Sequence, residues 1–305
     1  MYPETKSRQK GNSLIPTIAL LIGVFVLLVG VVLFFSSASS SLSGKCVAVV
    51  NLDDEISIQS IPASLFSAGK PGSEDIANSI SSLNKRDEIS GVLLVVNSPG
   101  GSVVATREIY NSFKDLKKPK VVYMREVAAS GGYYVSSAAD YIFADPNTIT
   151  GSIGVITTFT DLSGLLDKVG VNVTAVKSGE YKDIGSQSRS MSDNESKLIK
   201  DLILEVYSEF KGVVLENRKG KLDMARFDNA TDGRILSGRQ AKSLGLIDQL
   251  GTKKDALKYT ANLSGIDANE PRVCQISTSS ADEGLLSIKS LIGSISNRKL
   301  QIKFE

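Results

Sequence analysis

Three short stretches combine small residues with side chains that could carry out nucleophilic chemistry. They read NSPGGS at 97–102, ASGGYY at 129–134 and SGEYKDIGS at 178–186. Ser130 in the second stretch could act as a nucleophile, because attack would create an anion beside the free N–H of Gly131. The adjacent Gly100 and Gly101 allow a sharp turn that exposes further N–H donors for such an anion. These residue types suit acyl transfer through a serine.

The base that would activate this serine is not the common one. The 305-residue sequence contains no histidine, which excludes the Ser-His-Asp triad and removes the usual zinc ligand. Lys182 in the third stretch is a candidate. A lysine works as a general base only when burial lowers its amine pKa from about 10.4 toward 7, and lysines in polar loops are usually solvated. The neighbouring residues do not show which of these applies.

Both serine-containing turns also have a purely structural interpretation. Ser102 and Ser130 each stand directly before an expected helix, where serine is a favoured N-cap residue. The first turn would then be an ordinary Pro-Gly turn. The residues alone leave both interpretations open.

Apolar periodicity after residue 45 alternates between short continuous runs and amphipathic stretches, which is typical of an α/β domain. The continuous runs predict strands at 47–51, 91–97, 120–124, 141–144, 153–157 and 171–176. Helical spacing predicts helices around 76–83, 105–116, 133–139 and 253–263. The three polar stretches therefore follow strands, where functional loops of α/β folds gather.

The longest amphipathic stretch begins at Ser192, which can form a capping box with Glu195, and continues to Gly220. Its apolar residues share one side of the expected helix and are Leu198, Ile199, Leu202, Val206, Phe210, Val213 and Val214. We interpret this helix as structural.

An uncharged apolar run at 15–35 is close to the roughly 20 residues that a transmembrane helix needs. A cleaved signal peptide, whose apolar region is about 7–15 residues, and a buried core helix are the alternatives. Basic residues precede the run and the next one is Lys45, so we predict a cytoplasmic basic arm at 1–14 and an extracytoplasmic domain. The serine-rich residues 36–45 would form a flexible tether. We expect a single-pass protein of the cell membrane.

Charge and cysteine content limit the partners and the compartment. The net charge is +2, and without residues 1–14 acidic and basic residues are equal in number, which argues against a nucleic-acid partner. Cys46 and Cys274 could form a disulfide in an oxidising compartment or remain two unpaired thiols. We expect a catalytic domain at 46–277 and a tail of unknown role at 278–305. We expect no cofactor and no metal.

Five motifs, in this order, resemble those of the signal peptide peptidase A family of membrane-bound serine peptidases. They are NSPGGS, ASGGYYVSSAAD, TGSIGV, SGEYKD and GRILSGRQAKSLGLID. The resemblance extends over most of the chain after residue 45. It implies the α/β fold of Clp proteases and crotonases, a spiral of ββα units. It also implies an endopeptidase that cleaves signal peptide remnants or other apolar peptides at the membrane.

The same resemblance assigns roles to particular residues. It implies that Ser130 is the nucleophile and that Lys182 is the general base. Ser152, in TGSIGV, would orient the lysine amine. The backbone N–H groups of Gly101 and Gly131 would form the oxyanion hole.

The chain resembles the short form of the family, which has one catalytic module, so the resemblance implies a homo-oligomer. The serine and lysine of one site could come from the same chain or from two chains, and their spacing does not decide between these arrangements. Two other functions remain as alternatives. They are a catalytically silent, membrane-tethered scaffold and a Ser-Lys peptidase that acts on one membrane protein partner.

Overall fold

The computed structural model describes residues 44–62 and 69–278. Every element named below belongs to the compact unit that begins at Cys46. Three predicted segments lie outside the described residues. They are the membrane span at 15–35, the N-terminal basic segment at 1–14 and nearly all of the tail at 278–305. Among the helices that are described, none is both long and apolar enough to cross a bilayer.

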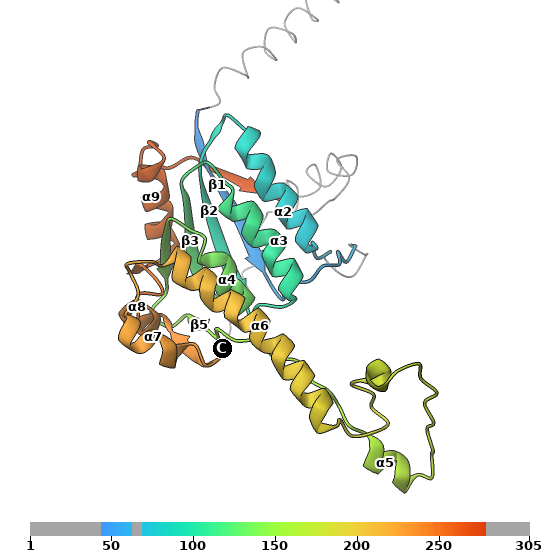
Figure 1. The fold of residues 1–305 in the computed structure, drawn as a ribbon. Coiled ribbons are helices and arrows are strands. Elements are labelled where there is room, and N and C mark those ends of the chain that lie inside the picture. The colour runs from blue at the N-terminus through green and yellow to red at the C-terminus, as the bar shows by residue number, and fades with distance from the viewer. Residues whose placement is uncertain (1–43, 63–68, 279–305) are drawn as a thin grey trace, which may run out of the picture. The chain divides into compact units, whose positions relative to one another are not determined.

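Eight strands and ten helical segments make up the described part of the domain (Figure 1). The strands are β1 (Cys46–Asp53), β2 (Ile89–Ser98), β3 (Lys120–Ala129), β4 (Tyr141–Ala144), β5 (Ile149–Gly151), β6 (Ile235–Ser237), β7 (Gln249–Leu250) and β8 (Val273–Ile276). The helices are α2 (Ser73–Ser82), α3 (Val103–Lys114), α4 (Gly131–Ser136), α5 (Ser163–Lys168), α6 (Asp193–Asn217), α7 (Met224–Ala230), α8 (Gly238–Ser243) and α9 (Lys253–Leu263). Short 3-10 helices are η2 (Leu83–Lys85) and η3 (Glu180–Asp183). The predicted α/β class is confirmed.

The strands form one mixed sheet in which β6-β5-β3-β2-β1-β8 is the main order. All pairs are parallel except β5 with β6. Both faces of the central strands are covered, which explains why their sequences are continuous apolar runs. Alternate residues of β1, such as Val49 and Val50, enter different hydrophobic clusters on the two faces. Helices α2, α3 and α4 pack on one face, and α9 packs on the other (Figure 1).

Strand β3 pairs with two different strands on the same side, and it does so beside the NSPGGS and ASGGYY turns. Its first half pairs with β4, while its last residues, Val127 to Ala129, pair with β5. Ser98 at the end of β2 pairs with Ala128 near the end of β3. The turns that follow β2 and β3 therefore leave the same edge of the sheet side by side, as expected for parallel strands.

A disulfide joins the first strand to the last. Cys46 in β1 and Cys274 in β8 are bonded, with 5.9 Å between their Cα atoms and 228 residues of sequence separation. Of the two possibilities that the sequence left open, the structure has the paired one.

The expected strands at 153–157 and 171–176 do not form. Ile153 is buried, but Ile156 is 85% exposed and Val176 is fully exposed, so this segment has no core to pack against. Neither stretch pairs with another strand of the sheet. Valine-rich runs favour a strand only when a neighbouring strand completes their hydrogen bonds. Residues 156–190, which we call the arm, instead carry α5 and η3.

Helix α6 confirms the predicted capping box and corrects the interpretation of its apolar side. The Ser192 hydroxyl accepts from the Glu195 N–H, and the Glu195 carboxylate accepts from the Ser192 N–H. Phe210 and Val214 are buried against the domain, but Leu202 is 53% exposed. Only the second half of the apolar stripe is therefore covered in the single chain, while the first half leads toward the arm (Figure 1).

Candidate active site

Ser130 occupies a sharp turn between β3 and α4. Its backbone has φ +51° and ψ −120°, a left-handed conformation that non-glycine residues rarely adopt and that costs on the order of 1–3 kcal/mol. The Ser130 N–H donates to the Gly151 carbonyl at 2.9 Å, and the Ser130 carbonyl accepts from the Tyr134 N–H at 2.9 Å. These two hydrogen bonds hold the strained backbone in place. They therefore fix the position at the edge of the sheet from which the Ser130 side chain projects.

The interpretation of these serines as helix caps does not fit the structure. Ser130 and Ser102 precede α4 and α3, yet neither side chain accepts a capping hydrogen bond. By contrast, Ser192, Ser237 and Thr252 cap their helices through the side-chain oxygen. The Ser130 hydroxyl is therefore left available for another purpose.

The turn after β2 packs directly against the turn that contains Ser130. A Cβ atom added to Gly100, whose φ is +104°, would lie 2.6 Å from the Gly131 nitrogen and 2.9 Å from the Ser130 Cβ. A side chain at Gly100 would therefore force the two turns apart. The Ile56 N–H donates to the Gly100 carbonyl, and the Ser102 N–H donates to the Ile56 carbonyl, which fixes the turn from its other side.

Two backbone amides beside Ser130 have no acceptor among the residues that the structure describes. No described residue accepts a hydrogen bond from the Gly101 N–H. The N–H of Gly131 opens α4 and belongs to the amides that a helix leaves without an internal partner. Both glycines line the same cavity as Ser130. This arrangement matches the requirement for an oxyanion hole, in which preset N–H donors meet the charge that forms during attack.

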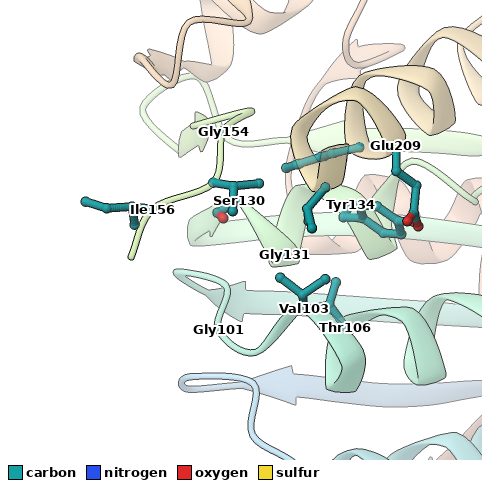
Figure 2. Close-up of a pocket in the computed structure, with 12 residues that line it drawn as sticks. Gly101, Val103, Thr106, Ser130, Gly131, Tyr134, Gly154, Ile156 and Glu209 are labelled. Carbon is teal, nitrogen blue, oxygen red and sulfur yellow. The ribbon is translucent and has the colours of Figure 1, made fainter. Parts of the chain in front are cut away.

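The cavity beside Ser130 has a volume of about 110 Å³. Its walls are mainly apolar and come from α3, α6 and the segment after β5 (Figure 2). The apolar lining residues are Val103, Val155, Ile156, Val206 and Phe210. A site of this size and character accommodates a small side chain of a peptide next to the nucleophile.

Polar groups of the cavity come from α3, α4 and α6. The Tyr134 hydroxyl donates to the Glu209 carboxylate at 3.1 Å, and Arg107 pairs with the same carboxylate at 3.2 Å. Burial raises the pKa of the Tyr134 hydroxyl above its usual range, and the Glu209 carboxylate adds to the shift. Tyr134 therefore remains a hydrogen-bond donor at physiological pH. Thr106 from α3 also lines the cavity.

Ser152 lies next to this cavity without lining it. It directly follows Gly151, the acceptor of the Ser130 N–H, and its own N–H donates to the Arg234 carbonyl at 2.8 Å. Ser152 has a φ of +49°, so it is the second serine of this region, after Ser130, with a left-handed backbone. The residues that follow Ser152 form part of the cavity wall, beginning with Gly154.

Lys182 lies apart from the other predicted site residues in the single chain. It belongs to η3 in the arm, is exposed, and does not line the cavity that contains Ser130. Its side chain forms no hydrogen bond or ion pair with the described residues. The single chain thus brings Ser130, Gly101 and Gly131 together around one cavity, while the Lys182 amine lies outside that cavity.

An ion-pair cluster ties the segment that carries Lys182 to the start of α6. Arg189 donates to the Asp183 carboxylate through Nε at 2.9 Å and Nη2 at 2.7 Å. It also donates through Nη1 to Glu195 at 2.9 Å, and Lys177 pairs with Asp183 at 2.6 Å. Arg189 and then Lys177 hold the pKa of the Asp183 carboxyl well below its usual range, and Arg189 lowers the pKa of Glu195 to about 2.

Sequence reasoning missed several groups around Ser130. Tyr134 stands one helical turn after Ser130, so its position in α4 was a usable signal. Thr106 and Glu209 gave no such signal. Thr106 lies in a stretch predicted only to be an amphipathic helix, and Glu209 lies in the helix that we interpreted as structural. The ion pairs of Arg189 were likewise outside the predicted site.

Two family profiles match the chain. The Clp protease profile matches residues 67–150, which contain the two adjacent turns, and the profile of peptidase family S49 matches residues 112–267. With the geometry at Ser130, these matches define a serine peptidase with a Clp-protease-like domain. The chain belongs to peptidase family S49, and the predicted family resemblance is confirmed.

Individual relatives agree with this assignment. The chain is 39% identical over 254 residues to "Putative protease MJ0651" of Methanocaldococcus jannaschii, which covers 82% of this chain and 80% of that protein. It is 38% identical over 198 residues to "Putative signal peptide peptidase SppA" of Enterococcus faecium, covering 64% of this chain and 57% of the relative. It is 31% identical over 231 residues to "Serine protease SPPA, chloroplastic" of Arabidopsis thaliana, covering 73% and 34%. The match thus spans only about a third of the plant protein.

Proposed function

We propose that this serine peptidase works through a Ser-Lys dyad formed between neighbouring copies of the chain. Ser130 is the nucleophile, and Lys182 from another copy is the general base. Ser152 orients the lysine amine, and the Gly101 and Gly131 amides bind the oxyanion. The observation that carries this proposal is the strained Ser130 turn in a protein without histidine. The hydroxyl of Ser130 forms no capping bond, and it stands beside two amides that have no acceptor in the described part of the chain.

The chemistry follows from these groups. The neutral lysine amine takes the Ser130 hydroxyl proton as Oγ attacks the peptide carbonyl carbon, and the resulting oxyanion accepts hydrogen bonds from the two amides. When the C–N bond breaks, the lysine ammonium returns the proton to the leaving amine. Water, deprotonated by the same lysine, then hydrolyses the acyl-enzyme. Activity is expected to rise with pH as the amine loses its proton, and a flat profile between about pH 6 and 10 would contradict a lysine base.

Apolar side chains exposed along the arm and the start of α6 support a dyad formed across chains. They are Ile156, Leu165, Val169, Val171, Val173, Val176, Leu198 and Leu202. An exposed apolar surface of this extent usually marks a contact with another protein. A second copy seated there would bury these side chains and would enclose the lysine, as a neutral amine requires.

The proposed setting is the outer side of a membrane. The apolar run at 15–35 would anchor the chain, and the preceding basic residues would keep residues 1–14 in the cytoplasm. The Cys46–Cys274 disulfide supports this orientation, because disulfides persist mainly in oxidising compartments. The proposed substrates are signal peptides or other apolar peptides at the membrane, in keeping with the mainly apolar cavity and with the name of the Enterococcus faecium relative.

The test combines a fluorophosphonate probe, which labels activated serines, with cleavage of a fluorogenic signal-peptide substrate by the full-length protein. Ser130→Ala should abolish both signals, and Lys182→Ala should lower both by at least about 10³-fold. Full activity in either variant would overturn the proposal.

Two control substitutions match these variants in type and location. Ser136→Ala removes a buried serine hydroxyl of α4 that donates to the Gly132 carbonyl. Lys168→Ala removes an exposed lysine of the arm. Both controls should retain labelling and cleavage, because neither residue contacts the Ser130 cavity.

A further inference from the structure

Thr106 carries an unpaired buried hydroxyl. The residue is only 3% exposed, and its Oγ1 is the one fully buried side-chain polar atom among the described residues that has no hydrogen-bond partner. Buried hydroxyls elsewhere in the described chain are bonded. Examples are Thr148, Thr150, Thr231, Thr260, Ser136 and Ser137. A group of this kind normally finds a partner, because leaving it unpaired is costly.

The Thr106 side chain avoids the partner that its own helix offers. A threonine within a helix commonly donates to the carbonyl four residues earlier, as Thr260 does to Ala256 at 2.7 Å. The corresponding carbonyl for Thr106 belongs to Ser102, and no such bond forms. The Thr106 side chain instead lies against Gly131. A Cβ atom added to Gly131 would be 2.5 Å from Thr106 Oγ1. It lines the cavity beside Ser130 (Figure 2).

The other polar side chains of the cavity, apart from Ser130, already have partners. The Tyr134 hydroxyl donates to Glu209, and Glu209 pairs with Arg107. The remaining side chains of the wall are apolar. Besides Ser130, Thr106 is therefore the described lining side chain with unused hydrogen-bonding capacity, and it lies next to Gly131, one of the two proposed oxyanion donors. Thr106 thus forms part of the wall of the cavity beside the nucleophile.

We propose that Thr106 is a specificity-determining residue that hydrogen-bonds a hydroxyl on the substrate residue whose carbonyl Ser130 attacks. The peptidase then favours serine at this substrate position over alanine, which has a similar size but no hydroxyl. The cavity, with a volume of about 110 Å³, accommodates either of these two side chains. This inference rests on the proposed role of Ser130 and extends it to the class of substrate.

The test uses two peptides that differ only in serine or alanine immediately before the scissile bond. The wild-type protein should cleave the serine peptide with a kcat/KM about tenfold higher. Thr106→Val, which replaces the hydroxyl by a methyl group, should lower the ratio of the two kcat/KM values to about one, and this ratio is the readout. Thr106→Ser keeps the hydroxyl and should keep the preference.

Thr260→Val is the matched control, since it removes a buried hydroxyl that is bonded within α9. It should lower the melting temperature without changing the serine preference. Thr106→Val should leave the melting temperature equal or higher, because it removes an unpaired group.

The outcomes separate this inference from the function on which it rests. Equal cleavage of both peptides by the wild type, or a serine preference that survives in Thr106→Val, overturns the role of Thr106 while leaving the peptidase intact. Absence of both cleavage and labelling in the wild type overturns the proposed function and this inference together.

Discussion

The turns around Ser130 and the arm that carries Lys182 are built in opposite ways. The turns at 98–101 and 129–131 are fixed by paired parallel strands, by backbone hydrogen bonds and by glycines that touch backbone atoms of the neighbouring turn. The arm at 156–190 is exposed, contains no strand, and is held to α6 by ion pairs. In the proposed mechanism, a single chain presets Ser130 and the two amides, whereas Lys182 joins them only through assembly.

The largest effect that would test this contrast is expected at Gly100. Gly100→Ala places a methyl group against the Gly131 nitrogen and should lower kcat/KM by about 10²-fold or more, because the two proposed oxyanion donors move apart. Gly170→Ala is its counterpart in the arm, since Gly170 also has a positive φ but no atom within 4 Å of an added Cβ. Its kcat/KM should change by less than about threefold. Peptide hydrolysis by both variants provides the check, and similar losses would refute the contrast.

A smaller effect on activity is expected when the arm loses its ion-pair cluster. Arg189→Gln leaves Asp183 and the buried Glu195 without their main cation, so η3 should loosen and kcat/KM should fall by about tenfold. The melting temperature should change little, because the arm lies outside the core. Hydrogen exchange and thermal melts measure the two effects. Arg226→Gln, which removes an exposed pair with Asp223, should leave both unchanged. Normal activity in Arg189→Gln despite faster exchange at η3 would contradict a positioning role.

The disulfide should show the reverse pattern, with a large effect on stability and none on activity. Replacing Cys46 and Cys274 together by alanine should lower the free energy of unfolding by about 2–5 kcal/mol and the melting temperature by roughly 5–15 °C. The strands that position Ser130 remain paired below the transition, so kcat/KM at 25 °C should stay the same. A loss of activity well below the melting temperature would show that the turns around Ser130 are less rigid than their contacts indicate.

The smallest expected effect is a pH dependence confined to the arm. Because Arg189 lowers the pKa of Glu195 from 4.5 to about 2, the pairing stabilises the folded arm fully above about pH 4.5 and is lost as the pH falls toward 2. Protection factors from hydrogen exchange at η3 and the first turn of α6 should decrease over this range, while those of β1 to β3 stay constant. Uniform loss of protection across the domain would argue against an independent arm.

The sequence predicted the strands and turns around Ser130 well, because the residues that indicate them are close together in the sequence. The runs VAVVN and GVLLVVN indicated buried strands, and the glycines after the second run indicated a turn. The structure confirms these features at β1, β2 and the Gly100 turn. The capping box of Ser192 and Glu195 was equally local and is confirmed. Ser130 itself could not be separated from a helix cap until its backbone angles and missing capping bond were known.

The arm could not be predicted in the same way, because its structure depends on what surrounds it. The valines at 171 and 173 alternate with polar residues as in a strand, but this stretch has no partner strand in the described chain. Leu202 belongs to a helical stripe that resembles a core face, yet it is exposed. Thr106 had no sequence signal at all, since a threonine in an amphipathic helix is ordinary until its hydroxyl proves to be unpaired.

The most direct test of a dyad shared between copies is subunit complementation. Full-length Ser130→Ala and Lys182→Ala chains are co-expressed and purified as mixed assemblies through two different tags. Each variant alone should be inactive. The mixture should regain up to about one quarter of wild-type activity, because random pairing places an intact Ser130 beside an intact Lys182 from the other chain. A mixed assembly that contains both chains and remains as inactive as the separate variants would contradict the shared dyad.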